Sequence, residues 1–320
     1  MEAGNITRAA EQLYVAQPAL GMQIRQLEVE LGVGLLTRHS RGVSPTKAGR
    51  ILYERACEIL RQVDEAEREI VAAGRQEREG VVLGLTTGVM VLIGREMVVR
   101  TRAELPGVNL GLLEEMSSLL MDALDREKVD FALAYDVRQR PGLLRVPLLE
   151  EELLFVCASA AAPRHDPVQF ADIVGLPLAL PGSGDVVRRH LLDTAKRLAL
   201  EPNVVLDVSS ISALRSLIVH GDMASIMPYG AIVDALERGQ VATRRIANPP
   251  LIRTLYFVRS LRRAPIKNED ALLDLLGALV IQFLGKLGPL GVKLAALERP
   301  LSETVARFGV QHDGADQILD

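Results

Sequence analysis

Side chains that can bond to the edges of nucleic-acid bases lie close together between Gln17 and Leu31. The apolar residues of this stretch recur at helical spacing, which predicts one amphipathic helix. Its inward face is predicted to hold Ala19 or Leu20, Ile24, Leu27 and Leu31. The face left for solvent or DNA then holds Gln17, Ala19, Gly21, Met22, Gln23 and Arg25. Amide and guanidinium groups on a narrow helix suit base edges in the major groove of DNA.

Two arginines follow this helix at a spacing that suits contacts with the DNA backbone. Residues 37–43 read as a small β-hairpin, in which Arg38 and Arg41 can meet phosphates or the minor groove. Residues 1–50 carry six basic and four acidic side chains, a net charge of +2, whereas the whole chain carries −4. We therefore expect a local and modest DNA-binding surface whose affinity depends on dimerisation and base contacts.

The elements that position these side chains are a first helix, a tight turn and the second helix. The first helix is predicted to open at Asn5 or Thr7, both good N-caps. Pro18 stands at an early position of the second helix, where its missing N–H costs nothing, and Gly32 ends that helix. The arrangement predicted is a helix-turn-helix with a wing.

These forty residues resemble the N-terminal domain of LysR-type transcriptional regulators. The motifs that carry the resemblance are Thr7-Arg8-Ala9-Ala10 with Leu13, Ala16-Gln17-Pro18-Ala19-Leu20 with Ile24 and Leu27-Glu28, Leu31-Gly32 with Leu35 and Arg38, and Gly42-Val43 with Thr46 and Ala48-Gly49. The resemblance implies base contacts from Gln17, Pro18, Ala19 and Gln23. It implies contacts to the DNA backbone from Arg25, Arg38, Arg41 and Thr46.

The family's first helix begins about fifteen residues upstream of the position that Met1 occupies in the motif. We expect an upstream start that supplies this helix, and an intact mass of the native protein matching Met1 would contradict that expectation. The alternative is a small-molecule-binding module that is defective in DNA binding because the first helix is absent. A winged helix that folds and binds specific DNA would decide between the two.

One long helix is predicted from Thr46 to about Ala73. Its apolar side chains alternate spacings of four and three, the seam of a two-stranded coiled coil. They are Leu52, Ala56, Ile59, Val63, Ala66 and Ile70. LysR-type regulators use this helix to pair two winged helices, which agrees with the pattern. A helix packed on its own domain is the other interpretation, and a polar linker bounded by Gly74 and Gly80 follows it.

Beyond Gly80 short β-rich runs alternate with helical ones, which indicates a mainly parallel α/β sheet. Strands are predicted at 80–86, 108–114, 129–135, 177–180, 204–208 and 223–227, and helices at 89–105, 117–127, 185–198 and 211–220. One long strand, Leu148–Ala158, is predicted to cross to a second lobe, Arg253–Val258 to cross back, and Glu269–Phe283 to form a closing helix. Two such α/β lobes form the periplasmic-binding-protein-like architecture, which resembles the family's effector domain.

Several predicted strands end in hydroxyl-bearing turns that open helices. Helix N-termini present unpaired N–H groups and a partial positive charge, so such turns at the carboxyl ends of strands suit a small anion. Each hydroxyl taken alone is also explained as an ordinary N-cap. By resemblance, effector contacts are expected at Thr86, Thr87, Ser117, Ser118, Ser183 and Ser209. Asp136 follows a strand and would disfavour an anion or meet an amine.

Other classes of function find little support in the composition. Cys57 and Cys157 lie a hundred residues apart without a nearby His or Cys at ligand spacing, which argues against a metal site, and Cys157 is expected to be a buried structural thiol. No catalytic constellation or phosphate-binding glycine loop is recognisable, so neither an enzyme nor a cofactor is expected. We find no signal peptide and no apolar run long enough to span a bilayer, which predicts a cytoplasmic protein without membrane contact.

The expected organisation is a winged helix-turn-helix over 1–48, a linker and dimerisation helix over 46–75, a two-lobed effector domain over 80–283 and a C-terminal extension over 284–320. The extension is predicted to hold at most one or two short helices between Val292 and Phe308. Expected partners are promoter DNA, a second or further copies of the chain as homodimer or homotetramer, a small anionic effector and RNA polymerase.

Within the family, the chain looks most like the nitrogen-assimilation-control group, some members of which act without a small-molecule coinducer. The residues that carry this finer resemblance are Gly42-Val43-Ser44-Pro45-Thr46, Ile51-Leu52-Tyr53 and Ile59-Leu60-Arg61-Gln62.

Overall fold

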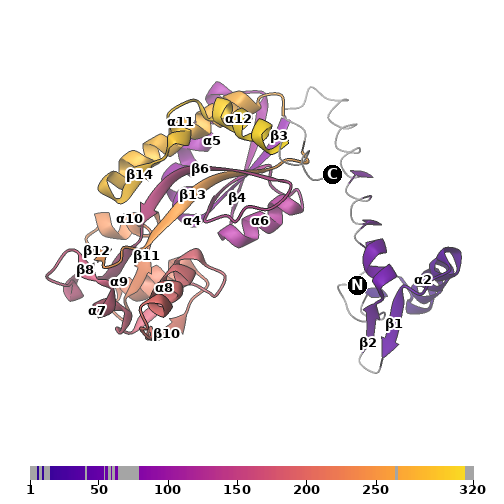
Figure 1. Cartoon of the computed structure of the whole chain (residues 1–320), viewed down its shortest axis with the longest axis horizontal. Coiled ribbons are helices and arrows are strands. Elements are labelled where there is room, and N and C mark those ends of the chain that lie inside the picture. The colour runs from indigo at the N-terminus through magenta and orange to yellow at the C-terminus, as the bar shows by residue number, and fades with distance from the viewer. Residues whose placement is uncertain are drawn as a thin grey trace. The chain divides into compact units, whose positions relative to one another are not determined.

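A computed structural model of the chain divides into two compact units, Met1–Glu77 and Arg78–Asp320. Figure 1 shows the elements of each unit, and each is considered by itself. The structure describes residues 6, 9, 10, 15–39, 42–53, 55, 56, 59, 62, 63, 79–263 and 266–313.

The first unit contains the expected helix and hairpin. Helix α2 spans Gln17–Leu31, with Pro18 in its first turn, and Gly32 closes it in the left-handed conformation at φ 67°. Strands β1 (Leu36–His39) and β2 (Gly42–Pro45) pair antiparallel. The predicted hairpin is thus confirmed, whereas the first helix lies mostly outside the described residues.

The inward face of α2 differs from the prediction. Leu20 and Ile24 are half-buried as expected, but Leu27 and Leu31 are 38% and 49% exposed. Glu28 is half-buried instead, and its carboxylate accepts hydrogen bonds from the backbone N–H groups of Leu35 and Leu36 at 2.7 and 3.1 Å. The inward face of α2 therefore includes the Glu28 side chain, which bonds to the hairpin, where the hydrophobic spacing predicted only apolar side chains.

The linker helix is described only in its first half. Residues 47–53, 55, 56, 59, 62 and 63 are helical. Leu52 and Ala56 of the predicted seam are half-buried, whereas Ile59 and Val63 are 59% and 49% exposed. Ala66 and Ile70 lie outside the described residues.

The second unit begins with a lobe built on a six-stranded sheet of order β14-β6-β13-β5-β3-β4. The strands are β3 (Glu79–Leu85), β4 (Val108–Glu114), β5 (Phe131–Tyr135), β6 (Leu143–Glu152), β13 (Ile252–Ser260) and β14 (Gly291–Lys293). The helices that connect them are α4 (Thr87–Val89), a π-helical segment Met90–Gly94, α5 (Arg95–Glu104) and α6 (Ser117–Asp125). Strand β3 runs parallel to β4 and β5, whereas β13 runs antiparallel to β5 and β6.

The second lobe repeats this plan. Its strands are β7 (Leu154–Ala158), β8 (Val168–Gln169), β9 (Leu178–Leu180), β10 (Val204–Asp207), β11 (Ser225–Met227) and β12 (Val241–Ala247). Its helices are α7 (Phe170–Val174), α8 (Val186–Arg197), α9 (Ile211–Val219) and α10 (Tyr229–Glu237). Strand β9 pairs parallel with β10 and bridges to Ala224 just before β11, so the order β10-β9-β11 matches β4-β3-β5 of the first lobe. Elements α7, β8, α10 and β12 were not predicted.

The predicted crossing strand Leu148–Ala158 is in fact two strands. Strand β6 begins earlier, at Leu143, and belongs to the first sheet, whereas β7 pairs with β11 and β12 in the second. Leu153 between them donates its N–H to the carbonyl of Leu251, 2.8 Å away, on the segment that returns to β13. The sequence carries no turn residue at this break, where three glutamates at 150–152 are followed directly by the apolar run 153–158.

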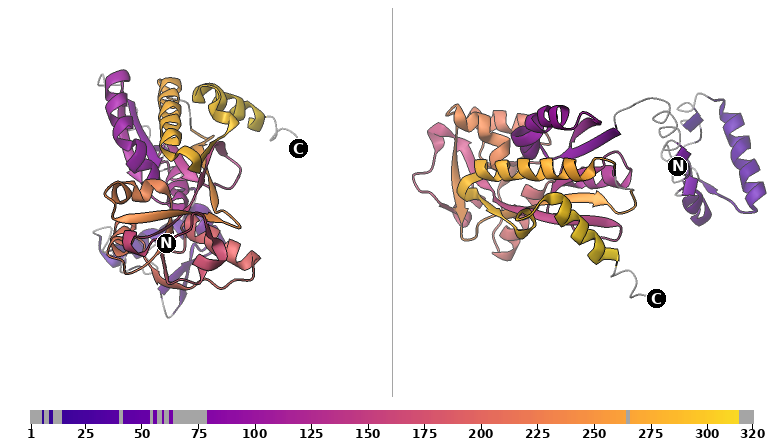
Figure 2. Two further views of the ribbon diagram at one scale, coloured as in Figure 1. Left: turned by 90° about the vertical axis from the view of Figure 1, so that its left-hand side faces the viewer. Right: turned by 90° about the horizontal axis from the view of Figure 1, so that it is seen from above.

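The C-terminal extension is more ordered than predicted. Strand β14 pairs antiparallel with β6, and helix α12 (Leu301–Asp313) lies beside α11 (Glu269–Leu287), as Figure 2 shows. Leu297, Leu301 and Val305 belong to the first lobe's core and are 1–5% exposed. The glycines and prolines of this region lie between ordered helices and strands, and they do not indicate a lack of secondary structure.

The expectation that no apolar run is long enough to span a bilayer is wrong for one helix. Residues Glu269–Leu290 are long and apolar enough to cross a bilayer by length and composition, with a mean hydropathy of 1.6. Half of that window is buried, and Leu272, Leu276 and Phe283 pack in the core of the first lobe. The same length and hydropathy therefore arise here from the central core helix of an α/β lobe.

Candidate functional site

A cavity of about 440 Å³ lies between the two lobes of the second unit. Its size falls within the range usual for small-molecule sites. The residues that line it are Thr86, Thr87, Gly88, Val91, Glu114, Glu115, Met116, Ser117, Pro181, Asp185, Val186, Val187, Ser209, Ser210, Ile211, Ser212, Arg215, Ile226, Met227, Pro228, Ala231 and Arg253.

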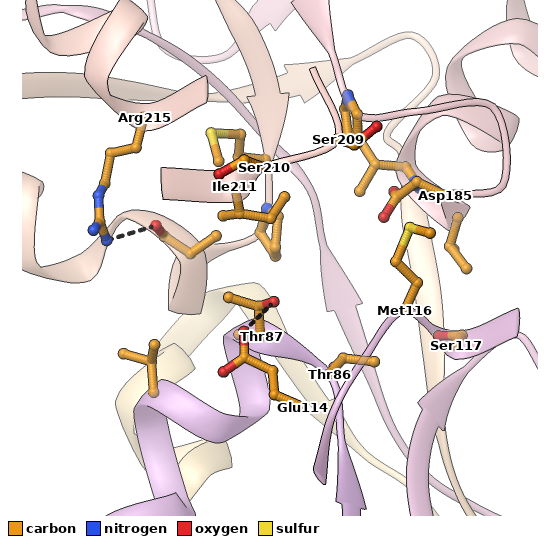
Figure 3. Close-up of a pocket in the computed structure, with 18 of the residues that line it drawn as sticks. Thr86, Thr87, Glu114, Met116, Ser117, Asp185, Ser209, Ser210, Ile211 and Arg215 are labelled. Carbon is orange, nitrogen blue, oxygen red and sulfur yellow. Dashed lines mark hydrogen bonds between the residues drawn. The ribbon is translucent and has the colours of Figure 1, made fainter. Parts of the chain in front are cut away.

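The repeated strand order places these side chains. Strands β3 and β4 end at Leu85 and Glu114, and β10 ends at Asp207, so the residues that follow come from the carboxyl ends of strands in both lobes. Figure 3 shows Thr86, Thr87 and Glu114 on one wall facing Ser209, Ser210 and Ile211 on the other. The cavity thus occupies the place where open α/β sheets bind ligands.

Four of the six expected effector residues line the cavity: Thr86, Thr87, Ser117 and Ser209. Ser118 and Ser183 are not among its lining residues. The Ser118 hydroxyl instead approaches Gly184 of the other lobe, where an added Cβ would lie 3.6 Å from Ser118 Oγ. Ser117 Oγ accepts a hydrogen bond from the N–H of Tyr135 at 3.0 Å, so that hydroxyl also joins α6 to β5.

Three carboxylates on the cavity wall were missed by the sequence analysis. Glu114 accepts a hydrogen bond from the Thr87 hydroxyl at 2.8 Å, and Asp185 caps α8 by accepting the N–H of Val187 at 2.7 Å. Glu115 follows Glu114 at the end of β4 and is exposed. The signal that could have found the pair is an acidic doublet directly after a predicted parallel strand.

Arg253, one of the lining residues, belongs to a buried charged cluster. Arg253 is 7% exposed and donates from Nε and Nη2 to Glu151 Oε2 at 3.1 and 2.8 Å. Its guanidinium lies 3.4 Å from the centre of the Tyr135 ring, and the Tyr135 hydroxyl donates to the same carboxylate oxygen at 2.6 Å. Sequence reasoning placed Arg253 on a crossing strand but gave no sign of this partnership, because Glu151 is 102 residues away.

The electrostatics of this cluster follow from its burial. Burial raises the pKa of the Tyr135 hydroxyl well above its usual value, and the neighbouring Glu151 raises it further, against the opposing effect of Arg253. For Arg253, burial favours the neutral form, but the charges of Glu151 and Tyr135 keep its pKa above the ordinary value. Arg253 and Glu151 are therefore an ion pair and Tyr135 a neutral donor.

Asp136 does not line the cavity. Its Oδ1 accepts the N–H of Thr254 at 2.9 Å, and its Oδ2 lies 2.6 Å from Nε2 of His190 on α8 of the second lobe. We expected this carboxylate to influence the effector. Instead, Asp136 joins β13 of the first lobe to α8 of the second lobe.

In the first unit, the polar face of α2 is open. Gln17, Pro18, Ala19, Gln23 and Arg25 are all exposed. The hydroxyl of Thr46, in contrast, donates to the carbonyl of Gly34 at 2.7 Å and accepts the N–H of Gly49 at 3.0 Å, so it caps the linker helix. The side chain of Arg38 and the whole of Arg41 lie outside the described residues.

Metal and thiol chemistry receive no support from the residues that the structure describes. Within that part of the chain, no three His, Cys, Asp or Glu side chains gather as a metal site would require. Cys157 is a buried free thiol whose pKa is raised by burial, against the opposing charge of Arg244. Such a thiol is a poor nucleophile. Cys57 lies outside the described residues.

Comparison with known proteins covers both units. Residues 1–50 match the family model for the bacterial regulatory helix-turn-helix protein, lysR family, and residues 74–280 match that for the LysR substrate binding domain. The nitrogen assimilation regulatory protein nac of Klebsiella aerogenes is 31% identical over 284 residues, which are 88% of this chain and 92% of that protein. The protein of the same name from Escherichia coli is 32% identical over 232 residues, 72% of this chain and 75% of its own length.

Solved structures agree on the fold. CbnR complexed with its target DNA superposes with a TM-score of 0.59 at 21% identity, covering 88% of this chain and 95% of CbnR. An OxyR mutant from Corynebacterium glutamicum gives 0.58 at 23% identity, covering 90% of this chain and 92% of that one. With the helix-turn-helix, the two lobes and both family models in agreement, the chain belongs to the LysR family of transcriptional regulators, which carry a DNA-binding helix-turn-helix and an effector-binding domain and are not enzymes.

Proposed function

We propose that this protein acts in the cytoplasm by binding promoter DNA through α2 and its hairpin, as paired copies, with a small effector held in the cavity between the lobes. Gln17, Pro18, Ala19 and Gln23 meet base edges in the major groove, whereas Arg25, Arg38, Arg41 and Thr46 contact the backbone. RNA polymerase is the further partner of the DNA-bound assembly. Supporting the proposal, CbnR, a relative in fold, has been solved with its target DNA.

The observation that carries the DNA-binding part is the exposed first half of α2. All five of its proposed contact residues are open to solvent, while Leu20 and Ile24 on the opposite face are half-buried. Gly32 and the bonds from Glu28 to the hairpin hold the helix end in place. A helix fixed in this way presents its N-terminal side chains as a rigid unit, which base readout requires.

The pairing part rests on the linker helix. Ile59 and Val63 lie one turn apart at seam spacing and are each about half exposed or more. Covering such side chains with a second copy removes apolar surface from water, at about 25 cal/mol per Å². Leu52, Ala56, Ala66 and Ile70 complete the proposed seam.

The test is fluorescence anisotropy with DNA from upstream of the protein's own reading frame, compared with a scrambled duplex across a salt series. We expect Gln23→Ala to lose sequence preference by roughly tenfold, since one bidentate base contact contributes about 1–3 kcal/mol. The matched control is Gln282→Ala, the same change on an exposed position of α11. Equal preference in Gln23→Ala and wild type would contradict the assignment of α2 as the reading helix.

A further inference from the structure

The charges on the cavity wall limit which class of effector can bind, if the cavity holds the effector as proposed above. Three carboxylates line it, Glu114, Glu115 and Asp185, against two guanidinium groups, Arg215 and Arg253. Arg253 already has Glu151 as its buried counter-ion. The cavity therefore holds an excess of negative charge, which opposes a simple carboxylate effector, whereas the hydroxyl-bearing turns alone had led us to expect an anion.

None of these three carboxylates has a cation in direct contact, although the charge of Asp185 contributes to the raised pKa of Arg253. Among the described residues, no Lys, Arg or His nitrogen forms an ion pair with Glu114, Glu115 or Asp185. Glu114 uses Oε1 for the Thr87 hydroxyl, and Asp185 uses Oδ1 for the α8 cap. Each keeps its second oxygen available for a donor, and a cation gains most from them.

A separate observation points to an acceptor on the ligand. Arg253 lines the cavity and is more than nine-tenths buried, yet its hydrogen bonds leave from Nε and Nη2 only. Within the described structure Nη1 has no acceptor, and it is not among the atoms sealed away from solvent. A guanidinium has five N–H donors, so Arg253 still offers donors toward the cavity.

Hydroxyl donors lie near the same wall. Thr86 Oγ1 is sealed from solvent and has no hydrogen-bond partner among the described residues. Helix α6 begins at Ser117, and its N-cap, Met116, provides no side-chain bond to the first turn. Because Thr86 Oγ1 is sealed, the donors of this wall come from Ser117 at the start of α6, whereas Glu114, Glu115 and Asp185 offer acceptors.

We propose that the effector carries both a cationic group and a hydrogen-bond acceptor, as a small free amino acid does. Its ammonium group lies against Glu114 and its neighbouring carboxylates, and its carboxylate accepts from Arg253. A lone anion would add to the excess negative charge of the cavity, and a lone amine would leave the free donors of Arg253 without an acceptor. A free amino acid also fits well within a cavity of about 440 Å³.

The experiment uses isothermal titration calorimetry on the full chain with each proteinogenic L-amino acid. Any that binds is compared with its deaminated acid and its decarboxylated amine. We expect an amino acid to bind and each truncated analogue to bind at least tenfold more weakly. Glu114→Gln, which keeps an acceptor for Thr87, should weaken the amino acid about tenfold but leave the deaminated acid unweakened. The matched control, Glu237→Gln on an exposed position of α10, should change nothing.

The outcomes separate the ligand class from the proposed function. Binding of only the deaminated acids, or only the amines, with loss in Ser209→Trp, would overturn the zwitterion but retain the cavity as effector site. If no probe of the three classes binds while the chain still binds its DNA, both the inference and the effector role fail, and only DNA binding stands.

Discussion

Removing the carboxylate beneath the cavity should be among the most destabilising single changes in the second unit. Glu151 is 1% exposed, and its Oε2 accepts from Arg253 and Tyr135. At the 2.8 Å separation of Arg253 Nη2 and Glu151 Oε2, the attraction between unit charges is about 6 kcal/mol at an effective dielectric constant near 20. Desolvation of both ions offsets much of that, so the net contribution of the pair is small.

The cost of breaking the pair is different, because it leaves a buried cation without its counter-ion. We expect Glu151→Leu to lower the free energy of unfolding by about 3–5 kcal/mol. Arg253→Met alone should cost a similar amount, since it strands the carboxylate. The double variant Glu151→Leu with Arg253→Met replaces both charges by apolar groups and should lie near the wild type or above it.

The assay is urea denaturation of the four proteins, followed by intrinsic tyrosine fluorescence and by circular dichroism, to give a double-mutant cycle. A coupling of a few kcal/mol between the two positions supports the interpretation. Single-variant costs below about 1 kcal/mol, with additive effects, would refute it, because they would mean that water screens the pair.

Three further predictions concern packing and pH. Gly230→Ala should destabilise by about 1–3 kcal/mol, because its Cβ would lie 2.4 Å from the carbonyl oxygen of Gly88, whereas Gly285→Ala has open space and should stabilise slightly; thermal melts compare the two. Leu301→Ala, at a residue 1% exposed, should cost about 2–5 kcal/mol by urea titration, and a loss under 0.5 would show that α12 is not part of the core. Because the pKa of Tyr135 is raised in the folded protein, its neutral form contributes stability below the unfolded-state pKa, which is about 10. This contribution is lost as the pH rises from that value toward the folded-state pKa. Tyr135→Phe should therefore show a flatter fall in the free energy of unfolding between about pH 9 and 11.

Local patterns predicted several elements of both units at or near their observed limits. The helix start at Pro18 and its end at Gly32 are short-range signals, and α2 follows them. Alternating β-rich and helical runs likewise predicted β4 at its observed limits, Val108–Glu114. Around Leu153 the boundary between two strands could not be seen, since no glycine, proline or other turn residue separates the glutamates at 150–152 from the apolar run that follows.

The cavity was only partly predictable. Hydroxyl turns at strand ends identified Thr86 and Ser209, but the same signal also selected Ser183, which does not line the cavity. Arg253 and Glu151 meet only because β6 and β13 pair in register, with Arg253 opposite Glu151. Such long-range pairings carry no local signature. The expectation of an upstream start stays a prediction.

A DNase footprint of the purified chain on DNA upstream of its own reading frame tests promoter binding through α2 directly. We expect two protected half-sites on one face of the duplex, centred one helical turn or a multiple apart, as paired reading helices require. We also expect Gln23→Ala to erase them at the concentration that protects with wild type. Protection that is absent, or equal on scrambled DNA, would contradict the claim that this chain reads a promoter through α2.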